Sequence, residues 1–225
     1  MVSLVAALVV LALEAALLAY ALGGWRVLRS IPQAMALLLV WGVAGVALAW
    51  SRPIGRQDVV RIERDAVVML ALLILPYSIP FVSAAGRSLP AAQFAPAWRD
   101  AIAWGGVAIA ALGLWLRVAS MRQLGARFSP LVAVQREHAL ETRGLYARIR
   151  HPGYAGALVA SLGAALAFGS WVALPLWGLM LLAQWARVRR EERVLAAHFG
   201  TAWTEFAART GALVPRRWSW LALHE

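Results

Sequence analysis

Long apolar runs, separated by short polar segments, dominate this chain of 225 residues. Six such runs are recognisable, at residues 4–22, 34–50, 66–82, 101–116, 154–168 and 171–185. Uninterrupted apolar runs of this length are typical of membrane-spanning helices. The pattern therefore predicts an all-α protein, a polytopic membrane bundle of about five to six transmembrane helices.

Breaks in the pattern refine this expectation. Only Gly169 and Ser170 separate the last two runs, which predicts an antiparallel helical hairpin. Each run of that hairpin would form roughly 22 Å of helix, against a hydrocarbon core of ~30 Å, so full crossing and re-entry both stay open. Pro76 and Pro80 are predicted to kink or end the third helix. We interpret residues 83–100 as a loop.

The polar segments are unevenly distributed along the chain. Residues 52–65 read as a solvated connector, whereas residues 117–153 and 187–225 are predicted to form a cap outside the membrane. We therefore expect one membrane domain over residues 1–225, with four helices in 1–116 and a functional region in 117–225. The first run has no basic residue ahead of it, which favours a retained helix over a signal peptide.

Charge predicts the topology. The net charge is +11, and all 22 basic residues are Arg. If all six runs cross, 18 of these Arg lie on one side with both chain ends, and four lie on the other. The positive-inside rule then places both termini and the cap in the cytoplasm. We expect a multi-pass protein of a bacterial inner membrane, with anionic lipid headgroups and not nucleic acid as the counterpart of its Arg side chains.

Composition excludes several kinds of chemistry. There is no Cys, so a thiolate nucleophile, a disulfide, an Fe–S cluster and a Cys-ligated zinc are absent. His138 and His151 lie 13 residues apart without a regular metal-ligand pattern or an obvious third ligand, so no metal is expected. The sequence also lacks a Gly-x-Ser-x-Gly motif and both common nucleotide-binding glycine motifs.

The candidate chemistry centres on residues 144–156, where the polar cap meets the fifth apolar run. Gly144 permits a turn, and Pro152 disfavours helix at His151, so a loop should lead into a helix that begins near Gly153. A helix N-terminus suits a carboxylate, and the rings of this segment could stack and donate hydrogen bonds. The alternative is a belt of interfacial anchors, in which Tyr and Arg are common.

Two further placements carry charge at the membrane. Arg187 and Glu191 are one helical turn apart just past the last apolar run, and so share a face. They could bind an anionic and a cationic group of ligands, or simply form an interfacial ion pair. Glu14 lies within the first apolar run. It could face the interior of the bundle and have a function, or it could be protonated or lie near the edge of the membrane.

Taken together, these segments resemble the isoprenylcysteine carboxyl methyltransferase family of integral-membrane enzymes that use S-adenosylmethionine. The family pattern is His-x-Leu, Gly-x-Tyr, Arg-His-Pro-x-Tyr-x-Gly, then an Arg and a Glu four apart, Phe-Gly and an aromatic tail. The matching positions are 138–140, 144–146, 150–156, 187 and 191, 199–200, and Trp203, Phe206, Val214 and Pro215. The resemblance covers about residues 115–216. Leu145, Gly153, Trp203 and Phe206 depart from the usual residues without removing a charge.

The resemblance implies a site and a reaction. Its cofactor-binding residues would be Gln135, His138, Ala139, Leu140, Glu141, Tyr146, Arg150, His151, Pro152, Gly153, Tyr154 and Glu191. Arg187 would hold the acceptor's anionic group, which makes Arg187 and Glu191 the catalytic pair. The acceptor would be a lipophilic molecule from the bilayer: a prenylcysteine-like carboxylate, another lipid, or a small thiol or amine. A nicotinamide-dependent membrane reductase and a non-catalytic lipid-binding protein remain the alternatives.

Overall fold

The computed structural model describes residues 2–50, 59–63, 66–125, 132–135 and 140–216. Within these ranges the chain is mainly helical, with three short 3-10 turns and two strands. The helices are α1 Val2–Ala21, α2 Trp25–Ser30, α3 Pro32–Ala49, α4 Ala66–Ala85, α5 Pro96–Leu124, α6 Pro152–Leu166, α7 Leu174–Phe199 and α8 Thr201–Arg209. The 3-10 turns are Gly86–Ser88, Pro90–Ala92 and Gly144–Ala147, and the strands are β1 Val59–Glu63 and β2 Val132–Gln135.

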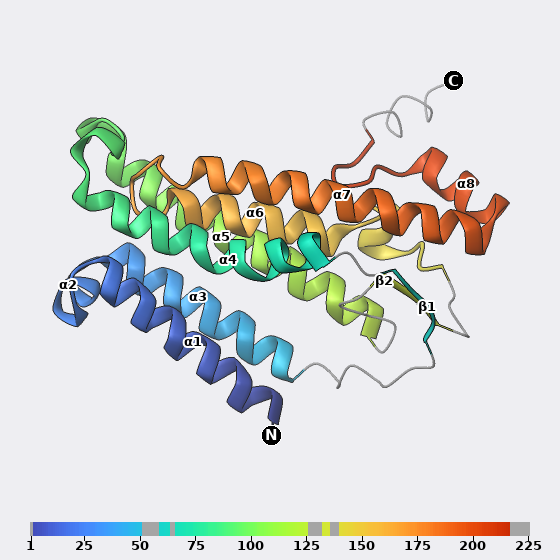
Figure 1. The fold of residues 1–225 in the computed structure, drawn as a ribbon, viewed down its shortest axis with the longest axis horizontal. Coiled ribbons are helices and arrows are strands. Elements are labelled where there is room, and N and C mark those ends of the chain that lie inside the picture. The colour runs from blue at the N-terminus through green and yellow to red at the C-terminus, as the bar shows by residue number, and fades with distance from the viewer. Residues whose placement is uncertain (1, 51–58, 64–65, 126–131, 136–139, 217–225) are drawn as a thin grey trace.

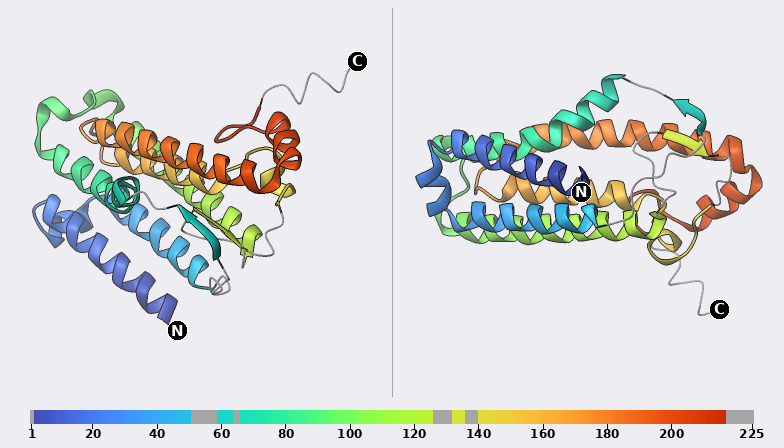
Figure 2. Two further views of the ribbon diagram at one scale, coloured as in Figure 1. Left: turned by 45° about the vertical axis from the view of Figure 1, so that its right-hand side comes forward. Right: turned by 90° about the horizontal axis from the view of Figure 1, so that it is seen from below.

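The long helices lie side by side in one bundle, with α2 and α8 as short helices at its two ends (Figures 1 and 2). Among the residues that the structure describes, four segments are long and apolar enough to cross a membrane: Leu4–Ala21, Pro32–Ala49, Ala66–Ser88 and Pro96–Leu124. Helix α6 is a shorter apolar helix beside them. The predicted class, an all-α polytopic membrane bundle, is confirmed.

Two boundaries in the middle of the chain differ from expectation. Helix α4 continues through Pro76 and Pro80 to Ala85, so the alternative that these prolines end it is wrong. Membrane helices tolerate internal proline because neighbouring groups support the backbone, and here the Ser83 hydroxyl ties α4 to α6 by donating to the Ala165 carbonyl at 2.6 Å. Helix α5 begins at Pro96, a residue suited to the first helical turn, so the predicted 83–100 loop is shorter.

Strands β1 and β2 pair antiparallel, with Val59 opposite Gln135 and Ile62 opposite Ala133. They lie on the connector between α3 and α4 and on the segment between α5 and α6 (Figure 1). The sequence pattern predicted no strand in either segment, although β-branched residues recur in each strand. This small sheet therefore adds to the predicted helical fold and joins its two halves at one end of the bundle.

The predicted antiparallel hairpin is confirmed as α6 and α7 (Figure 1). The Trp177 indole N–H donates to the Leu158 carbonyl at 2.9 Å and holds its two helices together. Helix α7 does not stop with the apolar run but continues through the Arg-rich segment to Phe199. A single helix thus carries the chain from the apolar region to the charged end of the molecule.

Glycines bring α5 and α6 into backbone contact. A Cβ added to Gly113 would lie 2.2 Å from the Ala160 nitrogen, and one added to Gly163 would lie 2.2 Å from the Ala110 nitrogen. Small residues at membrane helix interfaces allow this approach, because no side chain separates the backbones. The pairing fixes the end of α5 against the start of α6.

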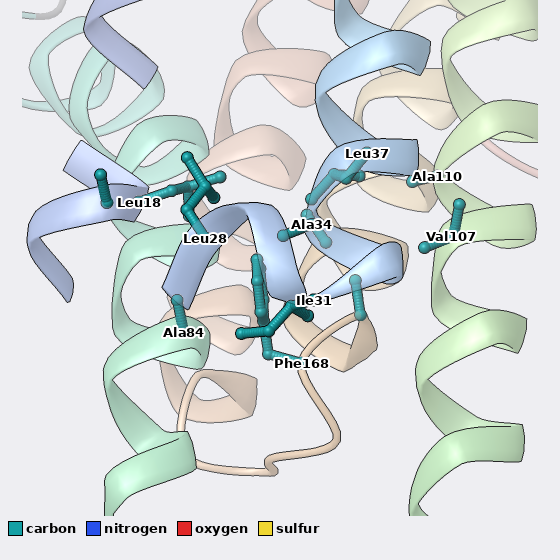
Figure 3. Close-up of a cluster of buried hydrophobic side chains, with 12 residues drawn as sticks. Leu18, Leu28, Ile31, Ala34, Leu37, Ala84, Val107, Ala110 and Phe168 are labelled. Carbon is teal, nitrogen blue, oxygen red and sulfur yellow. The ribbon is translucent and has the colours of Figure 1, made fainter. Parts of the chain in front are cut away.

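The end of the bundle that contains α2 is closed by an apolar cluster (Figure 3). Its central side chains are fully or almost fully buried: Leu18, Leu28, Leu37 and Phe168. They come from α1, α2, α3 and the α6–α7 connection. The polar groups described next gather at the opposite end, where α5 ends and α6 begins.

Candidate active site

The candidate site forms where the N-terminus of α6 meets the charged half of α7. His151 is the N-cap residue of α6 and Pro152 occupies its first turn, as the sequence predicted for a helix beginning near Gly153. A proline fits there because the first turn needs no amide hydrogen bond. Tyr154 follows in the same turn and faces α7.

Tyr154 joins the cation and the carboxylate of α7. Its hydroxyl donates to Glu191 Oε2 at 2.6 Å and accepts a hydrogen bond from Arg187 Nε at 2.9 Å. The guanidinium carbon of Arg187 also lies 5.1 Å from the Tyr154 ring centroid. Arg187 is buried, with 8% of its surface exposed, and its Nη1 lies 3.3 Å from the Met69 sulfur of α4. The tyrosine hydroxyl thus holds opposite charges on one helix face.

His151 stacks on this arrangement. Its ring is nearly parallel to that of Tyr154, with centroids 5.5 Å apart. Its Nδ1 lies 3.8 Å from Glu191 Oε1, and its Nε2 lies 3.3 Å from Glu192 Oε1. The Nε2 contact lacks hydrogen-bond geometry, which leaves a buried ring nitrogen without a hydrogen bond in the described part of the chain. That nitrogen is available to a ligand or to a small rotation toward Glu192.

Arg150, which was predicted to bind the cofactor, contacts α7, the end of α8 and the residue after α8. Its Nε donates to Glu192 Oε1 at 2.7 Å, and its Nη1 donates to the carbonyls of Ala207 and Thr210. Burial favours the protonated form of Glu192, but contacts from His151 and Arg150 outweigh it and lower the pKa of Glu192 to about 2. Arg150 therefore directs its donors into protein contacts.

Arg117 is a basic residue that was not among the predicted site residues. It lies on α5, is half-buried, and its Nη1 donates to the Gly153 carbonyl at 3.1 Å. It also interacts electrostatically with Tyr154 and Arg187. The signal was present in the sequence, since Arg117 is the first charged residue after the fourth apolar run. A second cation thus lies beside the Arg187–Tyr154–Glu191 group.

Tyr146 is placed by the turn that precedes α6. Gly144 adopts a φ of 52°, and the Gln123 side chain of α5 holds this turn through bonds with the Arg143 carbonyl and the Leu145 amide. Tyr146 is buried, and its hydroxyl lies 3.5 Å from the Ser120 carbonyl.

Ser120 also lies beside Gly153, where this chain departs from the family pattern. A Cβ on Gly153 would lie 2.9 Å from the Ser120 hydroxyl, so a larger residue there would require that hydroxyl to move. Tyr146 and Gly153 are therefore brought to the same short stretch of α5.

The remaining predicted residues lie upstream. Leu140 and Glu141 are half-buried, and Glu141 Oε1 accepts from the Arg143 amide at 3.1 Å. Gln135 ends β2, a strand that packs against α7. His138 and Ala139 lie outside the described residues. No metal-binding group of three His, Cys, Asp or Glu side chains occurs in the described ranges.

This arrangement can recognise a ligand that carries both signs of charge. Arg117 and Arg187 offer two guanidinium groups, and Glu191 offers a carboxylate whose side chain is about one quarter exposed. Buried Arg near a membrane requires compensation by anionic or polar groups. The site therefore suits an anion beside the Arg pair and a cation beside Glu191.

Comparisons with known proteins point to one family. The phospholipid methyltransferase family profile matches residues 101–202. Over 107 residues the chain is 35% identical to the protein-S-isoprenylcysteine O-methyltransferase of Schizosaccharomyces pombe, covering 46% of this chain and 45% of that protein. It is 31% identical to protein-S-isoprenylcysteine O-methyltransferase B of Arabidopsis thaliana, covering 49% and 57% of the two chains. The chain thus spans about half the length of these relatives.

A solved structure shows that the fold is shared. It is the eukaryotic intramembrane Ras methyltransferase ICMT, isoprenylcysteine carboxyl methyltransferase, which superposes with a TM-score of 0.57 at 21% identity. The superposition covers 82% of this chain and 67% of that one. The family match runs from α5 to the start of α8 and therefore includes the site. The chain is similar in sequence to isoprenylcysteine carboxyl methyltransferases and shares the fold of one of them.

Proposed function

We propose that this chain is an integral-membrane methyltransferase that moves a methyl group from S-adenosylmethionine to the carboxylate of a lipophilic acceptor. The observation that carries the proposal is the Tyr154 hydroxyl, which joins Arg187 to Glu191 at the charged end of the bundle. The methyltransferase names of the sequence relatives favour this reaction over a nicotinamide-dependent reductase.

The cofactor side of the site is assigned to the residues around Glu191 and His151. S-adenosylmethionine supplies a methyl group already activated by a sulfonium and carries an ammonium and a carboxylate. Glu191 suits the ammonium, and the buried Nε2 of His151, which has no hydrogen bond, suits a polar partner. Tyr146, Tyr154, Leu140 and the backbone at Pro152 and Gly153 complete the proposed cofactor contacts, together with the upstream residues Gln135, His138, Ala139 and Glu141.

The acceptor side is assigned to Arg187, with Arg117 as a second cation. A carboxylate acceptor is ionised at neutral pH, so the chain needs no general base to activate it. Its residues instead orient the anion and keep water away, which supplies most of the rate enhancement for an activated methyl donor. This requirement fits a site built from two Arg side chains, a tyrosine and a carboxylate.

The proposed orientation places the site and both chain ends in the cytoplasm. The helix ends that border the Arg-rich segments, including the start of α6 and the end of α7, lie at one end of the bundle (Figure 1). Those segments hold 18 of the 22 Arg residues, which favours the cytoplasmic side. The acceptor would then enter from the bilayer and the cofactor from the aqueous side.

Thermal unfolding in detergent tests cofactor use. S-adenosylmethionine and its demethylated product should each raise the unfolding temperature of the wild type, because a ligand that binds only the folded state stabilises it. At a thousandfold excess over Kd the stabilisation would be about 4 kcal/mol. A shift with reduced nicotinamide and none with either methyl-donor ligand would contradict the proposal.

A matched pair of acceptors tests the carboxylate assignment. We expect transfer of a radiolabelled methyl group to an isoprenylcysteine carboxylate and no transfer to the corresponding carboxamide, which lacks the negative charge. Equal labelling of both compounds would show that the acceptor atom is not a carboxylate oxygen. Labelling of membrane extracts would then identify the natural acceptor.

A further inference from the structure

The segment that follows α8 lies against the turn that carries His151. The Arg150 amide donates to the Gly211 carbonyl at 2.8 Å, and the His151 amide donates to the Ala212 carbonyl at 3.0 Å. The Gly211 amide donates back to the Arg148 carbonyl at 3.3 Å. These bonds run along both segments as in a short parallel ladder, although residues 211–212 lie beyond residue 202, where the family match ends.

The Arg150 side chain also holds this segment in place. Arg150 is 11% exposed and donates to the carbonyls of Ala207 and Thr210, at the end of α8 and just after it. Its guanidinium carbon lies 5.9 Å from the ring centroid of Trp203 on α8. Its Nε pairs with Glu192 of α7 at 2.7 Å. The Arg150 guanidinium therefore connects α7, α8 and the following segment to the turn before α6.

The same Glu192 oxygen that pairs with Arg150 also lies 3.3 Å from His151 Nε2. The His151 ring stacks on Tyr154, whose hydroxyl binds Glu191. Arg150 therefore holds the carboxylate that lies beside the His151 ring. A continuous series of contacts leads from the C-terminal segment to the centre of the candidate site.

We propose that Arg150 is a positioning residue: it latches residues 207–212 onto the His151 turn and, through Glu192, fixes the His151 ring beside Glu191. Cofactor affinity then depends on the end of α8 and the residues that follow it. The latch itself follows from the contacts of Arg150, and only its effect on cofactor affinity rests on the proposed function.

Hydrogen exchange and methyl-transfer kinetics on the full chain in detergent test the latch. In Arg150→Gln and Glu192→Gln we expect the amides of residues 148–151 and 210–212 to exchange at least about tenfold faster, because each variant removes a charged hydrogen bond. The KM for S-adenosylmethionine should rise roughly tenfold with kcat within about twofold. Arg150→Lys should lie between the wild type and Arg150→Gln, since an ammonium lacks the planar fork.

A neighbouring Arg provides the control. The Arg148 side chain is exposed on the same turn, so Arg148→Gln should leave exchange and KM unchanged. The double variant Arg150→Gln/Glu192→Gln should exchange no faster than either single variant if the two residues act as one unit.

Wild-type exchange in Arg150→Gln, or equal effects of Arg148→Gln, would overturn the latch. An unchanged KM with faster exchange would overturn its role in positioning the site. A wild type that binds no S-adenosylmethionine would contradict the proposed function, and the exchange comparison would still decide whether the latch exists.

Discussion

Helices α5 and α6 touch backbone to backbone, whereas α1 and α3 meet through side chains. A Cβ on Gly113 of α5 or Gly163 of α6 would lie 2.2 Å from a backbone nitrogen of the other helix. A Cβ on Gly42 of α3 would instead lie 3.2 Å from the Leu11 side-chain end, and one on Gly45 would lie 3.4 Å from the Ala7 methyl group. The first interface fixes two backbones relative to each other, and the second can adjust by moving a side chain.

This difference between the two interfaces matches the location of the candidate site. Arg117 of α5 must reach the Gly153 carbonyl of α6 within hydrogen-bond distance, so the two helices need one fixed register. Helices α1 and α3 bury mainly leucine and alanine and contribute none of the proposed site residues. Close glycine packing therefore accompanies the site, and looser side-chain packing accompanies the supporting helices.

The largest expected effect is the loss of the carboxylate at the centre of the site. Glu191→Gln should weaken S-adenosylmethionine binding by roughly 30-fold or more, because it removes the negative charge proposed to pair with the cofactor's ammonium at a partly buried position. Equilibrium binding in detergent measures it. Glu205→Gln, an exposed acid on α8, is the control, and equal affinities for both variants would argue that Arg187 and Glu191 form only an interfacial pair.

A change at Arg187 should act on the acceptor. Arg187→Lys keeps the charge but loses the geometry that contacts Tyr154, so the acceptor KM should rise about tenfold while cofactor affinity changes little. Arg189→Lys, on the exposed face of α7, should behave as the wild type. A selective loss of cofactor affinity in Arg187→Lys would reverse the assignment of the two sides of the site.

Matched alanine substitutions compare the two helix interfaces directly. Gly113→Ala must displace backbone and should lower stability by about 1–3 kcal/mol or more, whereas Gly42→Ala displaces only the end of Leu11 and should cost less. Gly105→Ala is the control for helix propensity, because open space surrounds its Cβ position and the substitution changes no packing. Equal losses in unfolding temperature for Gly113→Ala and Gly42→Ala would remove the distinction between the interfaces.

The contribution of Glu192 to protein stability should change only at acidic pH. Its pKa is lowered to about 2 in the folded protein from an ordinary value near 4.5, so its stabilising effect is complete above that ordinary value. The effect is lost as pH falls from about 4.5 toward 2. The difference in unfolding temperature between wild type and Glu192→Gln should therefore be constant from pH 7 to about 5 and shrink below. A difference that already shrinks between pH 7 and 6 would contradict this.

The smallest effect on catalysis is expected for Glu14 in α1. The residue is 7% exposed and lies among the supporting helices, away from the residues of the proposed site. Because burying a carboxyl group opposes folding, Glu14→Leu should leave methyl transfer within about twofold and keep or raise the unfolding temperature. Lost activity in a stably folded Glu14→Leu would show that the N-terminal helices take part in the chemistry.

Local sequence patterns were enough to predict the spanning helices and the point near His151 where α6 begins. Long apolar runs predicted the spanning helices, and Pro152 after His151 predicted where α6 begins, because both effects act within a few residues. The continuation of α7 as one helix through the Arg-rich segment and the β1–β2 pair were not predicted, and for α4 the sequence left open whether its prolines end the helix. Each depends on partners distant in the chain that satisfy backbone groups or cover side chains.

By itself, the sequence determined that this is a polytopic helical membrane protein, since long hydrophobic runs favour the bilayer whatever their tertiary contacts. It also predicted that most Arg residues lie on one side of the membrane. It also placed His151, Tyr154, Arg187 and Glu191 in one family pattern. Only the tertiary structure decided which of these residues touch, that Arg117 joins them, and that Arg150 is engaged by α8 and the segment after it. Those outcomes depend on how α5, α6 and α7 pack: glycines bring the backbones of α5 and α6 together, and side chains join α6 to α7.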